Sequence, residues 1–364
     1  MTDSSWWYAR PGARGDWTCP PAPDGVRDFH ASLDGYAPTP LTELPSLADQ
    51  LGVGRVYVKD ESSRLGLPAF KALGASWAVH RVLAERRRYG DGAPLTLVTA
   101  TDGNHGRAVA RTARLLGQRA RVFVPRGVHP AAAAAIAAEG AEVTPVAGPY
   151  DEAVRRAAEA ARGPGAVLVQ DTAWPGYEEI PGWIVEGYST LFAEIDDQLG
   201  APDSGSPDLV AVPVGVGSLA QAAVTHYRGR PYGAAGPALL AVEPRAAACV
   251  LASLAGGEPV TVATGETAMA GLNCGTPSSI AWPHLRHGLD AAVAVTDADS
   301  ARAARDLAAL GVSSGPCGAA SLAGVRAALT GAGARERRTA LGVGAAATLV
   351  LLSTEGTAAN PQSH

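Results

Sequence analysis

The sequence lacks several features that mark common protein classes. Its four cysteines (Cys19, Cys249, Cys274 and Cys317) form no CxxC pair and have no histidine at metal-ligand spacing, so neither a zinc site nor a disulfide framework is indicated. No uninterrupted apolar run reaches the roughly eighteen residues of a membrane helix. The first residues contain no basic segment followed by an apolar one. We therefore expect a cytoplasmic protein with no metal, no membrane segment and no secretion signal.

An excess of positive charge is also absent. The formal net charge is −5, and only 18% of the residues are charged. Proteins that bind DNA or RNA neutralise phosphates with a surplus of lysine and arginine, which this chain does not have. Nucleic acid is therefore excluded as a partner.

Lysine is scarce: of thirty basic residues only Lys59 and Lys71 are lysines. A lone lysine on a helix is usually a solvated surface residue, but Lys71 lies in AFKALGAS, beside Phe70 and Leu73. Apolar neighbours desolvate an ammonium group and lower the pKa of lysine towards that of a usable amine. Lys71 is thus a candidate for Schiff-base chemistry.

The other lysine has a less distinctive setting. Lys59 alternates with apolar residues in VYVKDES. We expect it to face solvent or an acidic partner such as Asp60 or Glu61.

Short apolar runs alternate with helical patterns along the chain, which is typical of parallel sheets flanked by helices. The sequence predicts strands at 95–100, 120–125, 141–146, 166–170, 209–214, 238–243, 291–296 and 347–353, and helices at 106–116, 131–139, 150–162, 219–227, 298–310 and 318–329. The predicted fold class is α/β.

The length of 364 residues suggests about two domains. The segment 201–208 has a linker composition, and a second hinge is expected near 86–94. We predict a large domain built from 1–89 and 186–364 and a small domain spanning 90–185.

Residues that directly follow parallel strands are candidate site residues, because ligands bind beyond the carboxyl ends of such strands. GVGSLA (215–220) follows a strand and opens a helix, so its backbone N–H groups could hold one phosphate. The alternative is an ordinary tight turn. The full GxGxxG and GK[ST] patterns are absent, so neither NAD nor ATP is indicated.

Two aspartates also follow predicted strands. Asp102, in TDGNHG, could be a helix N-cap, and Asp171, in QDTAW, could be a turn residue. However, a reactive amine, a phosphate loop and two carboxylates at one sheet edge together favour a functional site.

These segments resemble the fold type II family of pyridoxal-phosphate enzymes, of the tryptophan synthase β type, and within it the diaminopropionate ammonia-lyases. The resemblance covers roughly residues 15–356. It rests on KDESSRLGLPAFKALGAS, TATDGNHGRAVA, QDTAWPGYEEIPGWIVEGY, the glycine loop at 215 and LLSTEG. Its most specific element is Asp102, where serine and threonine dehydratases carry serine. The implied fold has two domains, and the implied assembly is a homodimer.

The resemblance implies that Lys71 holds pyridoxal 5′-phosphate as a Schiff base, with Phe70 against the ring and Asn104 bonded to the phenolic oxygen. A hydroxyl from Ser353 or Thr354 would meet the pyridine nitrogen. The phosphate would be bound by Gly215, Val216, Gly217, Ser218 and Leu219, and the substrate carboxylate by the backbone of Asp102, Gly103, Asn104, His105 and Gly106.

The implied reaction removes the α-proton of an amino acid and then ammonia from its β-carbon, giving a 2-oxo acid and a second ammonia. The resemblance implies Asp102 as the base for a D-substrate and Asp171 as the base for an L-substrate.

The sequence departs from the family pattern at two places. SGPCGA places Pro316 and Cys317 where an acidic residue is expected, and CGTP places Thr276 where CGEP is expected. We expect Cys317 to be a small buried residue that opens a helix. Trp174, Trp183 and Tyr188 are expected to serve packing.

Because Pro316, Cys317 and Thr276 stand where acidic residues are expected near the cofactor, substrates other than a diamino acid are also considered. The chain could act on a serine-, threonine- or cysteine-like substrate as a dehydratase or β-replacement enzyme, or it could bind the cofactor without turnover. Two carboxylates argue against the last alternative, because a mere binder does not need proton acceptors.

Overall fold

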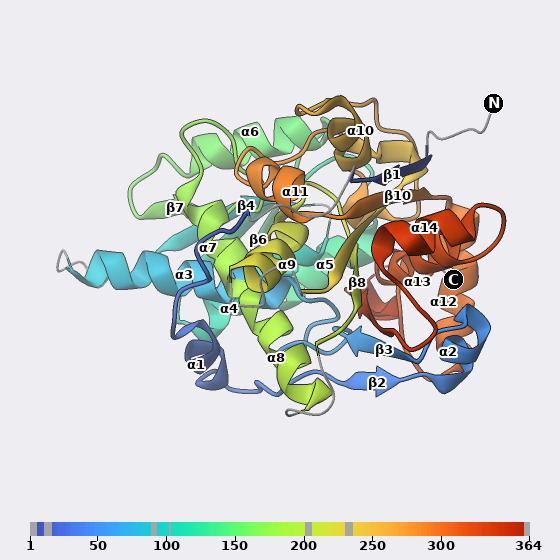
Figure 1. Ribbon diagram of the computed structural model, residues 1–364. Coiled ribbons are helices and arrows are strands. Elements are labelled where there is room, and N and C mark those ends of the chain that lie inside the picture. The colour runs from blue at the N-terminus through green and yellow to red at the C-terminus, as the bar shows by residue number, and fades with distance from the viewer. Residues whose placement is uncertain are drawn as a thin grey trace.

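The computed structural model describes residues 6–10, 17–88, 93–101, 103–200, 206–229 and 236–359, and these form an α/β fold with two sheets (Figure 1). All predicted strands and helices are present, with ends that differ by no more than about two residues. The fold class is therefore confirmed. The candidate base Asp102 lies outside the described residues, as do parts of the predicted linker and hinge.

The larger sheet has seven strands within the described residues. It combines parallel inner strands with one antiparallel strand at each edge. In spatial order the strands are β1 (Trp7–Ala9), β10 (Ala291–Val295), β9 (Ala238–Pro244), β8 (Leu209–Pro213), β11 (Thr348–Ser353), β3 (Arg55–Asp60) and β2 (Leu41–Glu43). The sequence did not predict β1, β2 or β3.

The smaller sheet has four strands in the described part of the chain, all parallel. In spatial order they are β6 (Glu142–Pro145), β5 (Arg119–Val124), β4 (Thr96–Ala100) and β7 (Ala166–Leu168). These strands all fall within the predicted small domain. The domain boundaries themselves stay a prediction.

Helices cover both faces of each sheet, as parallel sheets require. The helices are α1 (Val26–Ala31), α2 (Pro45–Leu51), α3 (Lys71–Arg88), α4 (Asn104–Leu115), α5 (Pro130–Ala138), α6 (Tyr150–Ala160), α7 (Glu179–Gly187), α8 (Ser189–Leu199), α9 (Ser218–Arg228), α10 (Cys249–Gly256), α11 (Trp282–Gly288), α12 (Asp297–Ala309), α13 (Pro316–Leu329) and α14 (Ala334–Leu341). Figure 1 shows α12, α13 and α14 gathered at one side of the molecule and α3 at the other. None of the helices in the described ranges is long and apolar enough to cross a membrane.

Successive residues of each inner strand point into different cores. In β8, Leu209 and Ala211 join the core that includes α13, whereas Val210 and Val212 join the core that includes α9. The second core also contains Leu97 of the small sheet. One hydrophobic core therefore continues between the two sheets, and helices α3, α4, α7 and α9 lie in it.

The small residues that follow Lys71 allow α3 to approach α7 closely. A Cβ atom added to Gly74 would lie 2.6 Å from the Tyr188 ring, and one added to Gly187 would lie 2.6 Å from the carbonyl oxygen of Leu73. Only glycine fits at these two positions. This contact fixes the beginning of α3, where Lys71 lies.

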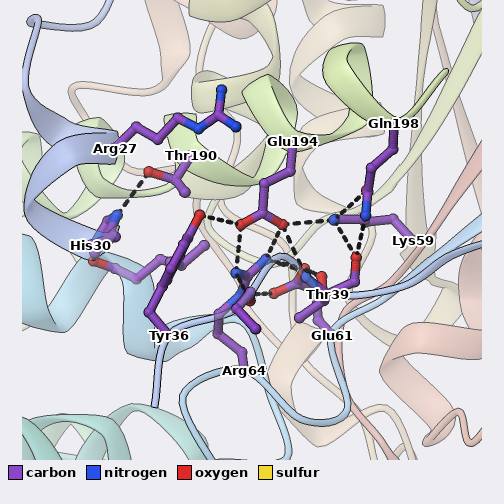
Figure 2. A network of polar contacts seen from close by, with 12 residues as sticks. Arg27, His30, Tyr36, Thr39, Lys59, Glu61, Arg64, Thr190, Glu194 and Gln198 are labelled. Atoms are coloured by element: carbon purple, nitrogen blue, oxygen red, sulfur yellow. Dashed lines mark hydrogen bonds and ion pairs between the residues drawn. The ribbon is translucent and has the colours of Figure 1, made fainter. Parts of the chain in front are cut away.

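A buried polar network holds the segment that leads to Lys71 (Figure 2). Glu194 of α8 accepts from Lys59 Nζ at 2.7 Å and from both terminal nitrogens of Arg64 at 2.7 Å. Arg64 also donates twice to Glu61, at 2.8 Å. All four side chains are 0% exposed, and their two positive and two negative charges cancel.

The expected environment of Lys59 is therefore wrong in part. Its side chain is completely buried rather than solvated, and its ion-pair partner is Glu194 rather than Asp60 or Glu61. The remaining donors of Lys59 reach the Thr39 carbonyl oxygen and Gln198 Oε1, both at 2.8 Å. A buried ammonium needs such a complete set of partners because desolvation is costly.

We expect Glu194→Gln to lower the free energy of unfolding by about 3–5 kcal/mol, because it leaves buried cations without their counterion. Urea unfolding measures the change. The matched control is Glu43→Gln, which removes an ion pair with Arg55 whose side chains are 39% and 44% exposed. This control should cost no more than about 1 kcal/mol.

The contribution of Glu194 should also depend on pH. Burial opposes ionisation, but Arg64 and Lys59 lower the pKa of Glu194 from 4.5 to about 2. Because the folded-state pKa is the lower one, the contribution is complete above pH 4.5 and is lost as the pH falls towards 2. Equal losses of stability in both variants, or the same acid dependence in wild type and Glu194→Gln, would contradict this role.

Candidate active site

Lys71 lies where the beginnings of several helices meet. It is the first residue of α3, while Asn104 begins α4 and Ser218 begins α9. The first turn of a helix carries unsatisfied N–H groups and the positive end of the helix dipole. An anionic ligand would therefore be stabilised here.

The Lys71 amine forms an ion pair with Asp171. Lys71 Nζ lies 2.5 Å from Asp171 Oδ2, and the two side chains are 24% and 11% exposed. Asp171 follows β7, as predicted, and its carbonyl oxygen accepts from Ser218 Oγ at 3.2 Å. The structure therefore brings Lys71, Asp171 and the glycine turn together.

The ionisation of Asp171 reflects two opposing effects. Burial alone would raise the pKa of this carboxyl group. The charge and the hydrogen bond of the neighbouring Lys71 ammonium oppose burial and lower the pKa of this carboxyl group. Asp171 is thus an anion while the Lys71 ammonium is beside it.

His105 is the second residue of α4 and is buried. Its Nε2 lies 2.8 Å from the Val169 carbonyl oxygen, and its Nδ1 lies 3.8 Å from Asp171 Oδ2. Burial lowers the pKa of His105. The sequence predicted only a backbone role for this residue, so the position of its side chain was missed.

The glycine turn has the shape expected of a phosphate cradle. Gly217 has a φ of 103°, and a Cβ atom there would lie 2.6 Å from Leu285 Cδ1. A Cβ atom on Gly215 would lie 3.0 Å from Cys274 Sγ. Ser218 and Leu219 then supply the first N–H groups of α9. Gly217 is therefore required in this turn, and the surroundings of Gly215 leave little room for a side chain.

Ser278 connects this turn to the segment after Asp171. Its N–H donates to the Val216 carbonyl oxygen at 2.8 Å, and its hydroxyl accepts from the Ala173 N–H at 3.4 Å. The cradle and the candidate base are thereby held in one unit.

Phe70 lies beside the amine, with its ring centroid 5.8 Å from Lys71 Nζ. The ring packs on Tyr188, centroid to centroid at 4.8 Å. Tyr188 and Trp183 are buried, which agrees with their predicted packing role. Trp174 is half-buried and stacks on Tyr177.

The end of β11 supplies the last predicted group. Ser353 is buried, and its hydroxyl donates to Ser314 Oγ at 2.8 Å. The Thr354 carbonyl oxygen accepts from the Phe70 N–H at 3.2 Å. Both residues therefore lie at the site, and the choice between their hydroxyls stays a prediction.

Glu355 is a site residue that the sequence reasoning missed. One carboxylate oxygen accepts from Asn104 Nδ2 at 2.7 Å, and the other accepts from the Cys317 N–H at 3.1 Å. Cys317 is buried in the first turn of α13, as predicted. Glu355 thus places a carboxylate between the first turns of α4 and α13. Its place in STEG, shortly after β11, was a signal for a position near the site but not for these two contacts.

Thr276 is the other residue that departs from the family pattern, and its hydroxyl does not contact Lys71 or Asp171. Thr276 is exposed, and its hydroxyl is 2.9 Å from the Thr261 hydroxyl.

Comparisons with known proteins agree with this geometry. The family model described as "Pyridoxal-phosphate dependent enzyme" matches residues 33–343. A diaminopropionate ammonia-lyase of Salmonella typhimurium is 40% identical, over 77% of this chain and 74% of that protein.

Two solved structures of the Escherichia coli diaminopropionate ammonia-lyase are also similar. The complex with an aminoacrylate-PLP azomethine intermediate has a TM-score of 0.85 and 34% identity, covering 95% of this chain and 92% of that one. The complex with D-serine has a TM-score of 0.88 and 32% identity, covering 97% and 94%.

Replacing Glu355 should destabilise the site. We expect Glu355→Ala to lower the free energy of unfolding by about 1–3 kcal/mol, because the buried N–H of Cys317 and the amide of Asn104 lose a charged acceptor. Urea unfolding of the cofactor-free protein measures the change. Glu355→Gln should cost less, because one acceptor oxygen remains.

The matched control is Glu258→Ala, since Glu258 is exposed. We expect a change within about 0.5 kcal/mol. If Glu355→Ala were as stable as this control, the two hydrogen bonds would have no energetic role.

Proposed function

Because this chain belongs to the pyridoxal-phosphate dependent enzymes of fold type II, with diaminopropionate ammonia-lyases among its relatives, we propose that it removes ammonia from a 2,3-diamino acid such as diaminopropionate. The products are a 2-oxo acid and ammonia. The observation that supports this most directly is the Lys71–Asp171 pair beside the glycine turn at 215–219.

The residues present fit pyridoxal phosphate. Lys71 offers the amine that would bind its aldehyde, and the turn from Gly215 to Leu219 offers donors for its phosphate. Asn104 would bind the phenolic oxygen, and a hydroxyl of Ser353 or Thr354 would meet the pyridine nitrogen. When bound, the cofactor supplies an electron sink that makes the α-proton of an amino acid acidic.

Asp171 supplies the base for an L-substrate in this proposal. While the Lys71 ammonium is adjacent, the carboxylate is stabilised as an anion and is a weak base. Movement of the ammonium away from Asp171 leaves a buried carboxylate, and burial raises its pKa. The same side chain then becomes a stronger proton acceptor, as general-base catalysis requires.

Asp102 supplies the base for a D-substrate. This assignment comes from its position in TDGNHG, since Asp102 is outside the described residues. The backbone from Asp102 to Gly106 would receive the substrate carboxylate at the beginning of α4, where the helix dipole favours an anion.

The proposal includes a homodimer in the cytoplasm. The assembly is inferred from the family resemblance, and the location from the four scattered cysteines, which fit a reducing compartment.

The products identify the reaction. With diaminopropionate, we expect two equivalents of ammonia for each 2-oxo acid, because both amino groups are lost. Colorimetric assays of ammonia and 2-oxo acid measure the ratio across a panel of amino acids. Lys71→Ala, the control, should lose both products and the visible absorbance of the bound cofactor.

A different outcome would favour the alternatives. A ratio of one, with a serine- or threonine-like substrate preferred, would replace the proposal by dehydration, as Pro316 and Thr276 suggest. A spectral change without products would indicate a binding protein.

The two aspartates should separate the substrate isomers. We expect Asp171→Asn to slow the L-isomer by roughly 10² to 10⁴ while sparing the D-isomer, and Asp102→Asn to do the reverse, because each removes one base. Steady-state kinetics with both diaminopropionate isomers measure the effect. Full activity of both variants on both isomers would contradict the assignment.

A further inference from the structure

The His105 ring contains an atom that the proposed reaction leaves unused. His105 Nδ1 is buried and has no hydrogen-bond partner among the described residues. The whole residue is only 4% exposed, so water does not easily satisfy this nitrogen. Such a buried, unpartnered polar atom is uncommon and requires an explanation.

The other ring nitrogen fixes the tautomer. A carbonyl oxygen only accepts hydrogen bonds, so Nε2, at 2.8 Å from the Val169 carbonyl oxygen, carries a proton. Burial, and the positive charge of Lys71, favour the neutral ring, although Asp171 opposes them. Nδ1 of a neutral ring that is protonated at Nε2 bears a lone pair.

His105 Nδ1 lies near the carboxylate of the candidate base. Nδ1 and Asp171 Oδ2 are 3.8 Å apart, and both are acceptors while Asp171 is ionised. Two acceptors without a shared proton do not form a hydrogen bond, and the separation of 3.8 Å is longer than a hydrogen bond. A proton on Oδ2 would convert the contact into an O–H···N hydrogen bond.

We propose that His105 is a positioning residue that accepts a hydrogen bond from Asp171 after Asp171 has taken the substrate's α-proton, and that it can then accept that proton. The proposal rests on the proposed role of Asp171.

The atoms balance in each step. The C–H bond of the substrate breaks, its electron pair stays with the substrate, and an O–H bond forms on Asp171. Transfer to Nδ1 breaks this O–H bond and forms an N–H bond, which leaves an imidazolium beside a restored carboxylate. The opposite charges stabilise each other, and the pair keeps the same total charge.

Two substitutions separate this role from packing. Glutamine can place an amide N–H near the position of Nε2, towards Val169, but has no acceptor at the position of Nδ1. Asparagine places its amide near the position of Nδ1 and loses the bond to Val169. Thus His105→Gln tests the contact with Asp171, and His105→Asn tests the structural bond.

We expect His105→Gln to lower kcat for the L-isomer by roughly 10-fold or more and to lower kcat for the D-isomer much less. Its cofactor affinity and its midpoint of thermal unfolding should match the wild type. His105→Asn should unfold at a lower temperature, and its turnover of both isomers should fall together. Equal effects of His105→Gln on the two isomers, or no effect, would overturn the proposal.

The same assay on Asp171→Asn distinguishes a failure of the role of His105 from a failure of the role of Asp171 as base. If Asp171→Asn slows the L-isomer selectively and His105→Gln does not, the role of His105 fails and the proposed function stands. If Asp171→Asn is not selective for the L-isomer, the base assignment itself fails.

A measurement without turnover gives an independent check. In cofactor-free protein labelled with ¹⁵N in the histidine rings, His105→Gln identifies the His105 signals by their loss from the spectrum. We expect a neutral ring near pH 7, protonated at Nε2 and unprotonated at Nδ1. A resting ring protonated at Nδ1 could not accept a proton, and this result would overturn the proposal.

Discussion

The arrangement of the site depends on a buried ionic network of two cations and two carboxylates. Glu194 of helix α8 binds Lys59 of strand β3 and Arg64 of the following loop, so three elements are joined at one carboxylate. The loop leads directly to the first residue of α3, which is Lys71. A neutral set of charges with complete hydrogen bonding can remain buried, whereas the removal of one member leaves an uncompensated charge. The position of the reactive amine is thereby set by contacts that never reach the ligand.

The site is formed by both sheets. One hydrophobic core lies between them, and helices α3, α4 and α9 within it begin near Asp171. Asp171 follows a strand of the small sheet, whereas the glycine turn at 215 follows a strand of the large one. Neither sheet alone carries Lys71, Asp171 and the glycine turn. Their proximity is a consequence of the shared core, which packs the two sheets so that the carboxyl ends of β7 and β8 lie close together.

The sequence predicted the elements with regular patterns and missed those that depend on distant partners. Eight strands could be predicted because apolar runs alternate with helical patterns. Strands β1 and β2 are only three residues long, and in β3 the buried Lys59 hides the apolar pattern, since its partner is 135 residues away. Lys71 and Asp171 could be predicted to meet from their places at helix and strand ends. Glu355 and the His105 ring could not, because their roles arise from side-chain contacts made across the fold.

The hydrogen bond between Asn104 and Glu355 connects an element of the small sheet with one of the large sheet, which bears on how the two sheets could move apart. Asn104 begins the helix beside the small sheet, and Glu355 follows the last strand of the large sheet. A primary amide nitrogen carries two hydrogens, so Asn104 can donate one to Glu355 and has a second that could be donated to a ligand. In the proposed site, binding of the cofactor's phenolic oxygen and the contact between the two sheets would therefore use different hydrogens of this nitrogen, and the bond to Glu355 need not break when a ligand enters.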